Sequence, residues 1–86
     1  MKEDFDIMQL LNVFEKIRTH GEERELGFYL EGITGYTDHD GYNVFLEGHQ
    51  VKLNAGFHNT YHLDYDSSRA YEQFVKKLKY IDKNYS

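Results

Sequence analysis

Hydrophobic residues recur every three or four positions near the start of the chain. This spacing gathers them on one side of a helix: Ile7, Leu10, Leu11, Phe14 and Ile17. Asp6 precedes the stripe as a good N-cap, and Gly21 follows it as a residue suited to ending a helix. The pattern therefore predicts an amphipathic helix between Asp6 and Gly21.

A second helical stripe lies close to the end of the chain. Its apolar members are Tyr71, Phe74, Val75, Leu78 and Ile81. The three residues before it, 66–68, are Asp, Ser and Ser, and each of them can cap a helix. The other side of this helix is basic and carries Arg69, Lys76, Lys79 and Lys83.

The middle of the chain alternates between two faces, as β-strands do. In residues 26–33, one face carries Leu26, Phe28 and Leu30, and the other carries Tyr29, Glu31 and Ile33. Gly32 and Gly35 predict a bulge or bend there. Further alternating runs cover residues 42–47, 51–57 and 61–65.

The turns between these strands fix the expected register. A two-residue turn at Gly48-His49 places Leu46 opposite Val51. A loop over residues 37–41 places Tyr36 opposite Tyr42, and a three-residue loop over 58–60 places Phe57 opposite Tyr61. Each choice keeps the apolar residues on one face, which a slip by one residue would not do.

These elements predict one α+β domain over residues 1–86. It is an antiparallel four-strand meander with the N- and C-terminal helices packed on one face, in the order α-β-β-β-β-α. The other face of the sheet is then open. It should carry Tyr29, Glu31, Ile33, Asn43, Phe45, Lys52 and Asn54, with His62 as a further candidate.

Composition narrows the setting in which this domain works. Six Phe and eight Tyr among 86 residues suit a small core, because each ring buries a large area. The chain has no cysteine, no signal-peptide pattern and no apolar run of membrane-spanning length, which predicts a soluble cytoplasmic protein. A net charge of −5 disfavours non-specific nucleic-acid binding.

Two patterns that contain histidine or aspartate could hold a metal ion. Residues 38–41, Asp-His-Asp-Gly, begin like a calcium loop, but the twelfth position is His49 instead of Glu, so a polar turn is the better interpretation. His58 and His62 would lie roughly 13 Å apart along a strand, although a turn at Asn59 would bring them closer. We assign no metal ligand, no cofactor and no catalytic residue, and we predict that the protein is not an enzyme.

Several short runs, taken in order, resemble a small family of uncharacterised bacterial proteins. They are the residues that match Leu11-x-x-Phe14-x-Lys16-Ile17-Arg18-x-His20-Gly21, Leu30-Glu31-Gly32-Ile33-Thr34, Asp38-x-Asp40-Gly41-Tyr42, Phe57-His58-Asn59-x-Tyr61 and Phe74-x-Lys76-Lys77-Leu78. This family is a domain of unknown function found mostly in marine gammaproteobacteria. The resemblance covers nearly the whole chain and implies no activity and no functional residues.

The leading functional hypothesis is a non-enzymatic interaction or regulatory module. It would self-associate or bind a protein partner through the open sheet face around Tyr29, Ile33, Phe45 and Lys52, because aromatic and aliphatic residues there exceed what a solvated surface needs. Nucleic-acid binding by the basic C-terminal helix is a less favoured alternative. A metal-dependent enzyme that uses His58, His62 and nearby aspartates is the third.

Overall fold

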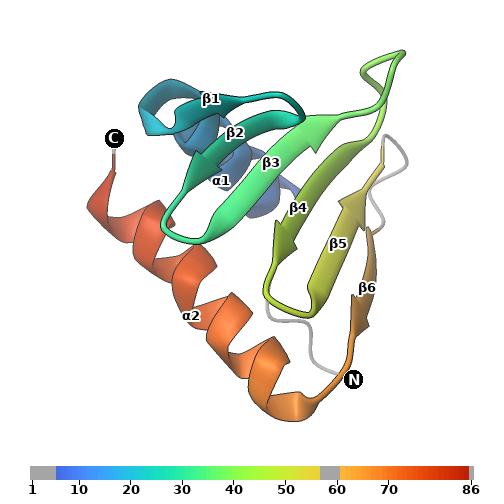
Figure 1. The fold of residues 1–86 in the computed structure, drawn as a ribbon, viewed down its shortest axis with the longest axis vertical. Coiled ribbons are helices and arrows are strands. Elements are labelled where there is room, and N and C mark those ends of the chain that lie inside the picture. Colours follow the sequence, from blue (N-terminus) through green and yellow to red (C-terminus); the bar gives the residue numbers. More distant parts are fainter. Residues whose placement is uncertain (1–5, 57–60, 86) are drawn as a thin grey trace.

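The computed structural model describes residues 6–56 and 61–85. Its helices are α1 (Ile7–His20) and α2 (Ser68–Asn84). Its strands are β1 (Glu22–Arg24), β2 (Gly27–Leu30), β3 (Ile33–Thr37), β4 (Val44–Gly48), β5 (Val51–Ala55) and β6 (Tyr61–Tyr65). The strands form one antiparallel sheet in chain order, with each strand beside the next (Figure 1).

The α+β class is confirmed, but the expected number of four strands is wrong. The structure has six strands, because the alternating run that begins at Leu26 forms two strands, β2 and β3, and the short strand β1 precedes them. All three residues of β1 are exposed, so this strand shows no alternation between apolar and polar positions. The side chains of β1 therefore give no sign of a strand in the sequence.

A tight turn at Glu31 and Gly32 separates β2 from β3. Their φ angles are 55° and 84°, as in the type I′ turn that joins two strands through two residues. Leu30 pairs directly with Ile33 across this turn. Paired residues share a face, so Ile33 lies on the same side of the sheet as Leu30 and not on the side predicted for it.

The predicted helix limits agree with the structure. Asp6 accepts a hydrogen bond from the backbone N–H of Gln9 at 2.7 Å, and Ser67 accepts one from Ala70 at 3.1 Å. Gly21 ends α1 with φ −82°, so it is not in the left-handed region. A side chain at this position would collide with the carbonyl oxygens of Ile17 and Tyr29.

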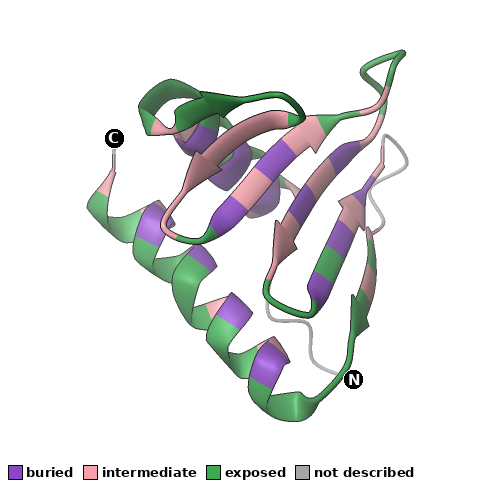
Figure 2. Ribbon diagram, in the orientation of Figure 1, coloured by how far each residue is buried: buried purple, intermediate pink, exposed green. Residues whose placement is uncertain are grey.

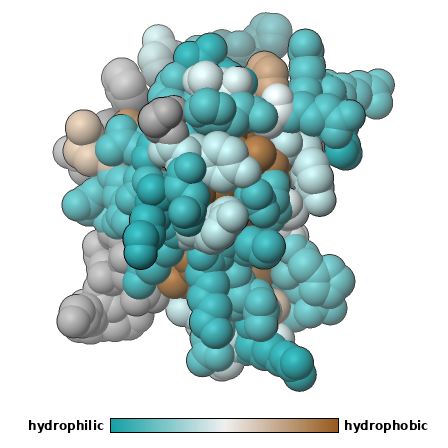
Figure 3. Space-filling model, turned by 90° about the vertical axis from the view of Figure 1, so that its left-hand side faces the viewer, coloured by the Kyte–Doolittle hydropathy of each residue, from teal (hydrophilic) through white to brown (hydrophobic). Residues whose placement is uncertain are grey.

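Both helices cover the inner face of the sheet. Helix α1 packs on β2, β3 and β4, helix α2 packs on β5 and β6, and the two helices contact each other. Figure 2 shows buried residues alternating with more exposed ones along β3 and β5. From the side that lies to the left in Figure 1, the described surface is mostly hydrophilic, with hydrophobic residues visible in small areas (Figure 3).

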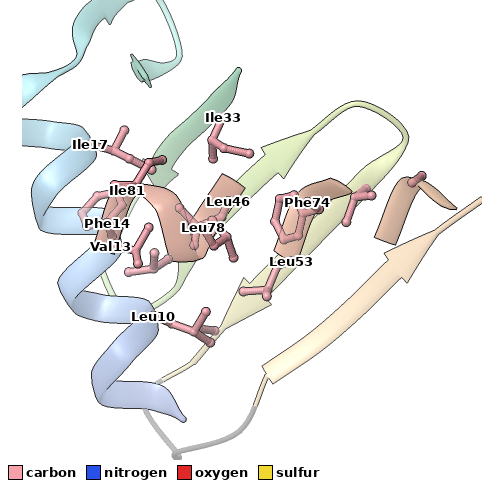
Figure 4. Packing of buried hydrophobic residues seen from close by; sticks show 14 residues of the cluster. Leu10, Val13, Phe14, Ile17, Ile33, Leu46, Leu53, Phe74, Leu78 and Ile81 are labelled. Carbon is pink, nitrogen blue, oxygen red and sulfur yellow. The ribbon is translucent and has the colours of Figure 1, made fainter. Parts of the chain in front are cut away.

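The core is one cluster between the helices and the sheet. Figure 4 shows Leu10, Phe14 and Ile17 of α1 in the same layer as Leu46 and Leu78. Leu10, Ile17, Leu46 and Leu78 are completely buried. The expected packing of both helices on one face therefore describes the arrangement correctly.

For the hairpin of β4 and β5, the prediction of which residues face the core is correct, but the predicted residue pairs are wrong. The turn between β4 and β5 is His49-Gln50, one residue later than predicted, and Leu46 pairs with Leu53 instead of Val51. The shift is an even number of residues, so the predicted core face is preserved.

The loop before β4 is longer than predicted, and this changes the face of Tyr36. Thr37 pairs with Val44, and Tyr36 pairs with Phe45 on the outer face. Its expected partner, Tyr42, lies in the loop with 59% of its surface exposed. On β6, Tyr61 pairs with Ala55, whereas Phe57 and the predicted loop over 58–60 lie outside the described residues.

Candidate functional site

The face of the sheet opposite the helices is not covered by any described helix or strand. We call it the outer face. Strand pairing gives its members as Glu22, Arg24, Tyr29, Thr34, Tyr36, Phe45, Glu47, Lys52, Asn54, His62 and Asp64. Aromatic rings on three adjacent strands, β2, β3 and β4, make up its centre.

One side of the outer face is built around Tyr29. The guanidinium of Arg24 lies 4.3 Å from the centroid of the Tyr29 ring, within the range of a cation–π contact. Arg24 also donates to Glu22 at 2.8 Å, so the cation is held between a carboxylate and a ring. These residues come from β1 and β2, whose pairing places Glu22 opposite Tyr29.

A second cluster lies over β3, β4 and β5. The rings of Tyr36 and Phe45 stack with centroids 4.8 Å apart, and Lys52 lies 5.6 Å from the Phe45 centroid. The Tyr36 hydroxyl donates to Glu47, whose carboxylate lies 3.8 Å from the Lys52 ammonium. These four side chains thus hold one another in place on the outer face.

Burial and the contact with Glu47 alter the chemistry of Tyr36. Partial burial, followed by the hydrogen bond to Glu47 and its negative charge, raises the pKa of Tyr36 from 10.0 to about 12. Tyr36 therefore keeps its proton at neutral pH and acts there as a hydrogen-bond donor.

Three of the four residues predicted for this surface lie on it. Tyr29 and Phe45 are half-buried on the outer face and Lys52 is exposed there. Ile33 is wrongly predicted: only 2% of its surface is exposed, and it packs in the core because the Glu31-Gly32 turn reverses the chain before it. Whether the other three bind anything stays a prediction.

The remaining positions expected on this face divide in the same way. Asn54 and His62 lie on it, whereas Glu31 belongs to the β2–β3 turn and Asn43 to the loop before β4. Tyr36 was missed as a surface residue. Strand alternation places Tyr36 on the face opposite Gly35. Which of these two faces is buried depends on the length of the loop between β3 and β4, and the predicted loop was too short.

The Asp38 loop is a polar turn held by its own carboxylate. Asp38 accepts hydrogen bonds from the backbone of Tyr42 and from both the backbone and the side chain of Asn43, at 2.7–3.3 Å. The side-chain bond from Asn43 is the main cause that lowers the pKa of Asp38. Both carboxylate oxygens are thus engaged in shaping the loop.

The histidine pattern is only partly placed by the structure. His62 is exposed on the outer face, and His58 lies outside the described residues. Within residues 6–56 and 61–85, no three His, Cys, Asp or Glu side chains are grouped in a way that could hold a metal ion. The metal-dependent alternative therefore gains no site from the described part of the chain.

The basic side of the C-terminal helix is present as predicted. Lys76, Lys79 and Lys83 are exposed on α2, and so is Arg69. Nucleic-acid binding by these residues stays a prediction.

One known protein family matches nearly the whole chain. A family model described as "Protein of unknown function (DUF3081)" matches residues 5–86. The chain belongs to this family. No curated protein and no solved structure matches the chain. In the described part of this DUF3081 protein, no helix has the length and apolar character needed to cross a membrane.

Proposed function

We propose that this DUF3081 protein is a non-enzymatic interaction module that associates with a second copy of itself through the outer face. The observation that carries the proposal is the run of rings on adjacent strands, Tyr29, Tyr36 and Phe45, which no described element covers. Aromatic residues and arginine are enriched in protein interfaces, because rigid rings gain contact area at low entropic cost.

The side chains of this surface are ordered by one another. Arg24 stays over Tyr29, Phe45 is stacked on Tyr36, and Glu47 lies between Tyr36 and Lys52. A surface that is already held in one arrangement loses less conformational entropy on binding than a mobile one does. This favours an interface over a purely solvated sheet face.

Charge balance favours a second copy as the occupant. Each cation of the outer face has its own carboxylate, Arg24 with Glu22 and Lys52 with Glu47, and Asp64 is the remaining charge. Two nearly neutral faces can meet without strong mutual repulsion. A two-fold arrangement also uses the same patch on both copies, as most homodimers do.

The test is the molar mass in solution, measured by light scattering across a range of protein concentrations. The wild type should move from 10.3 kDa toward twice that mass as concentration rises. Phe45→Asp should raise the dissociation constant at least about 30-fold, because it places a charge at the centre of the interface.

Tyr80→Asp is the matched control. Tyr80 is also an aromatic residue and 48% of its surface is exposed, but it lies on α2, away from the outer face. This variant should associate like the wild type. A wild type that stays monomeric at every concentration, or equal association of the two variants, would overturn the proposal.

A further inference from the structure

A cleft of about 450 Å³ lies between α2 and the adjacent end of the sheet. Its walls are the β2–β3 turn, the β4–β5 turn and the first half of α2, which lie near one another in Figure 1. The volume falls within the range of small-molecule sites, roughly 300–1,000 Å³. None of its lining residues belongs to the outer face.

The inner wall of the cleft is apolar and closely packed. It is formed by Ile33, Ala70 and Phe74, all of them buried, beside the backbone of Gly48. A Cβ at Gly48 would lie 2.8 Å from a ring carbon of Phe74 and 3.2 Å from Ile33 Cδ1. The glycine thus lets the Phe74 ring lie against the strand and gives the cleft a hydrophobic inner wall.

The rim of the cleft is polar and carries positive charge. Arg69 and Lys77 line it from α2, and both are exposed. Within the described residues, no ion pair neutralises either of them. The carboxylate that lines the opposite wall, Glu31, already accepts a hydrogen bond from the Tyr85 hydroxyl at 2.6 Å.

Arg69 is placed where it does not help its own helix. It is the second residue of α2, and the first turn of this helix contains no acidic residue. A cation near the N-terminus of a helix is opposed by the helix dipole. Because no acidic residue of the first turn offsets it, the charge of Arg69 is available to an anion in the adjacent cleft.

The two turns that wall the cleft are held in unusual backbone conformations. Glu31 and Gln50, with φ of 55° and 60°, are the non-glycine residues with left-handed φ in the described chain, and both line the cleft. Both residues stand in two-residue hairpin turns, where a positive φ lets the strands reverse direction, and the turns therefore hold this side of the cleft in one shape.

We infer that this cleft binds a small organic acid, with its carboxylate near Arg69 and Lys77 and its apolar body against Ile33, Ala70 and Phe74. The charge of the rim selects an anion, and the apolar wall selects against small hydrated anions such as phosphate. The inference is independent of the proposed self-association, because the two sites share no residues.

The experiment uses the full-length protein and sodium octanoate as the probe, followed by amide NMR shifts. Octanoate should shift the amides of Ile33, Gly48 and Ala70 with a dissociation constant in roughly the millimolar range, as expected for ten non-hydrogen atoms. 1-Octanol, which has the same chain without the charge, should bind at least about tenfold more weakly. Acetate, which has the charge without the chain, should cause no saturable shift.

Two double variants separate the cleft from general electrostatic attraction. Arg69→Gln with Lys77→Gln should weaken octanoate binding about tenfold, because hydrogen bonds to charged groups contribute about 1.5 kcal/mol or more. Lys76→Gln with Lys79→Gln makes the same change in net charge on residues of α2 that do not line the cleft, and should leave binding unchanged.

Each contrary result overturns the inference. Equal affinity for octanoate and 1-octanol would identify a groove with no preference for an anion. Equal weakening by the two double variants would mean that the net charge of the protein, and not the cleft, attracts the probe. Shifts confined to other parts of the chain would place the binding elsewhere.

Discussion

Tyr36 organises the centre of the outer face. Its ring stacks on Phe45 and its hydroxyl donates to Glu47. Tyr36 on β3 thus connects the aromatic contact with β4 to the ion pair that Glu47 forms with Lys52 of β5. Partial burial and the nearby carboxylate disfavour the ionised phenolate, and this raises its pKa. The folded state therefore holds the Tyr36 proton more tightly than the unfolded chain does.

Replacing Tyr36 by Phe should change how stability depends on alkaline pH. In the wild type, the contribution of Tyr36 is complete below pH 10 and is lost as pH rises toward about 12, because the unfolded chain releases this proton first. Tyr36→Phe should be less stable by about 1 kcal/mol below pH 10 and should lose less stability between pH 10 and 12. Urea unfolding at each pH measures both effects.

Tyr85→Phe is the control for this experiment. The pKa of Tyr85 is also raised, mainly by its hydrogen bond to Glu31, but Tyr85 is in α2's C-terminal cap and not on the outer face. The difference between wild type and Tyr36→Phe should persist in a Tyr85→Phe background. Parallel stability curves for wild type and Tyr36→Phe above pH 10 would contradict the role given to Tyr36.

Single turn residues decided which predicted surface positions were right. Tyr29, Phe45 and Lys52 were placed correctly because each lies within an alternating run. Ile33 was placed on the wrong face because Glu31 adopts a left-handed φ and forms a turn, and Glu is not a residue type that favours this conformation. A sequence with Asn in place of Glu31 would have indicated the two-residue turn directly.

At the scale of elements, α2 carries its charges unevenly. Its last turn holds Lys83, where a cation is favoured by the helix dipole, whereas its first turn holds Arg69, where a cation is disfavoured. The helix is nonetheless secured by the Ser67 cap and by its buried side. The N-terminal charge is thus a cost that the rest of the helix offsets.

Opposite effects on stability are expected at the two ends of this helix. Arg69→Gln should raise the free energy of unfolding by about 0.3–1 kcal/mol, and Lys83→Gln should lower it by a similar amount. Because 1 kcal/mol shifts the Tm of a small domain by roughly 4–8 °C, thermal unfolding at low salt resolves both changes. Destabilisation by Arg69→Gln would show that Arg69 has a structural role and would remove one argument for an anion in the cleft.

Elements with strong periodicity were predictable, and those without it were not. Both helices have a 3.6-residue stripe and a capping residue, so their limits follow from local chemistry. Strand β1 has three exposed residues and pairs with one neighbour, β2. Its existence depends on the backbone of β2 and leaves no trace in its own side-chain pattern.

At the scale of the whole molecule, a sequential meander brings every strand beside its neighbour in the chain, and the two terminal helices close the inner face. Helix α1 is joined to α2 by Lys16, whose ammonium lies 2.5 Å from the Asp82 carbonyl oxygen and 3.2 Å from its carboxylate. The layered arrangement was predictable because one face of the sheet and one side of each helix are apolar. The cleft was not, because it depends on where two turns meet a helix.

In the described part of the chain, fourteen buried apolar residues form one cluster to which both helices and three strands, β3, β4 and β5, contribute, so the loss of packing at its centre should weaken the whole fold. Leu46→Ala, at a completely buried position of β4, should lower the free energy of unfolding by about 2–5 kcal/mol. A chain of 86 residues has a small total stability, so this loss is a large fraction of it.

Leu26→Ala makes the same substitution where 59% of the surface is exposed, and should cost less than about 0.5 kcal/mol. Urea unfolding followed by both far-UV and near-UV circular dichroism measures the two values, and in Leu46→Ala both signals should be lost together. Separate transitions for the two signals would contradict a single cooperative core, and the helices and the sheet would then have to be treated as units of different stability.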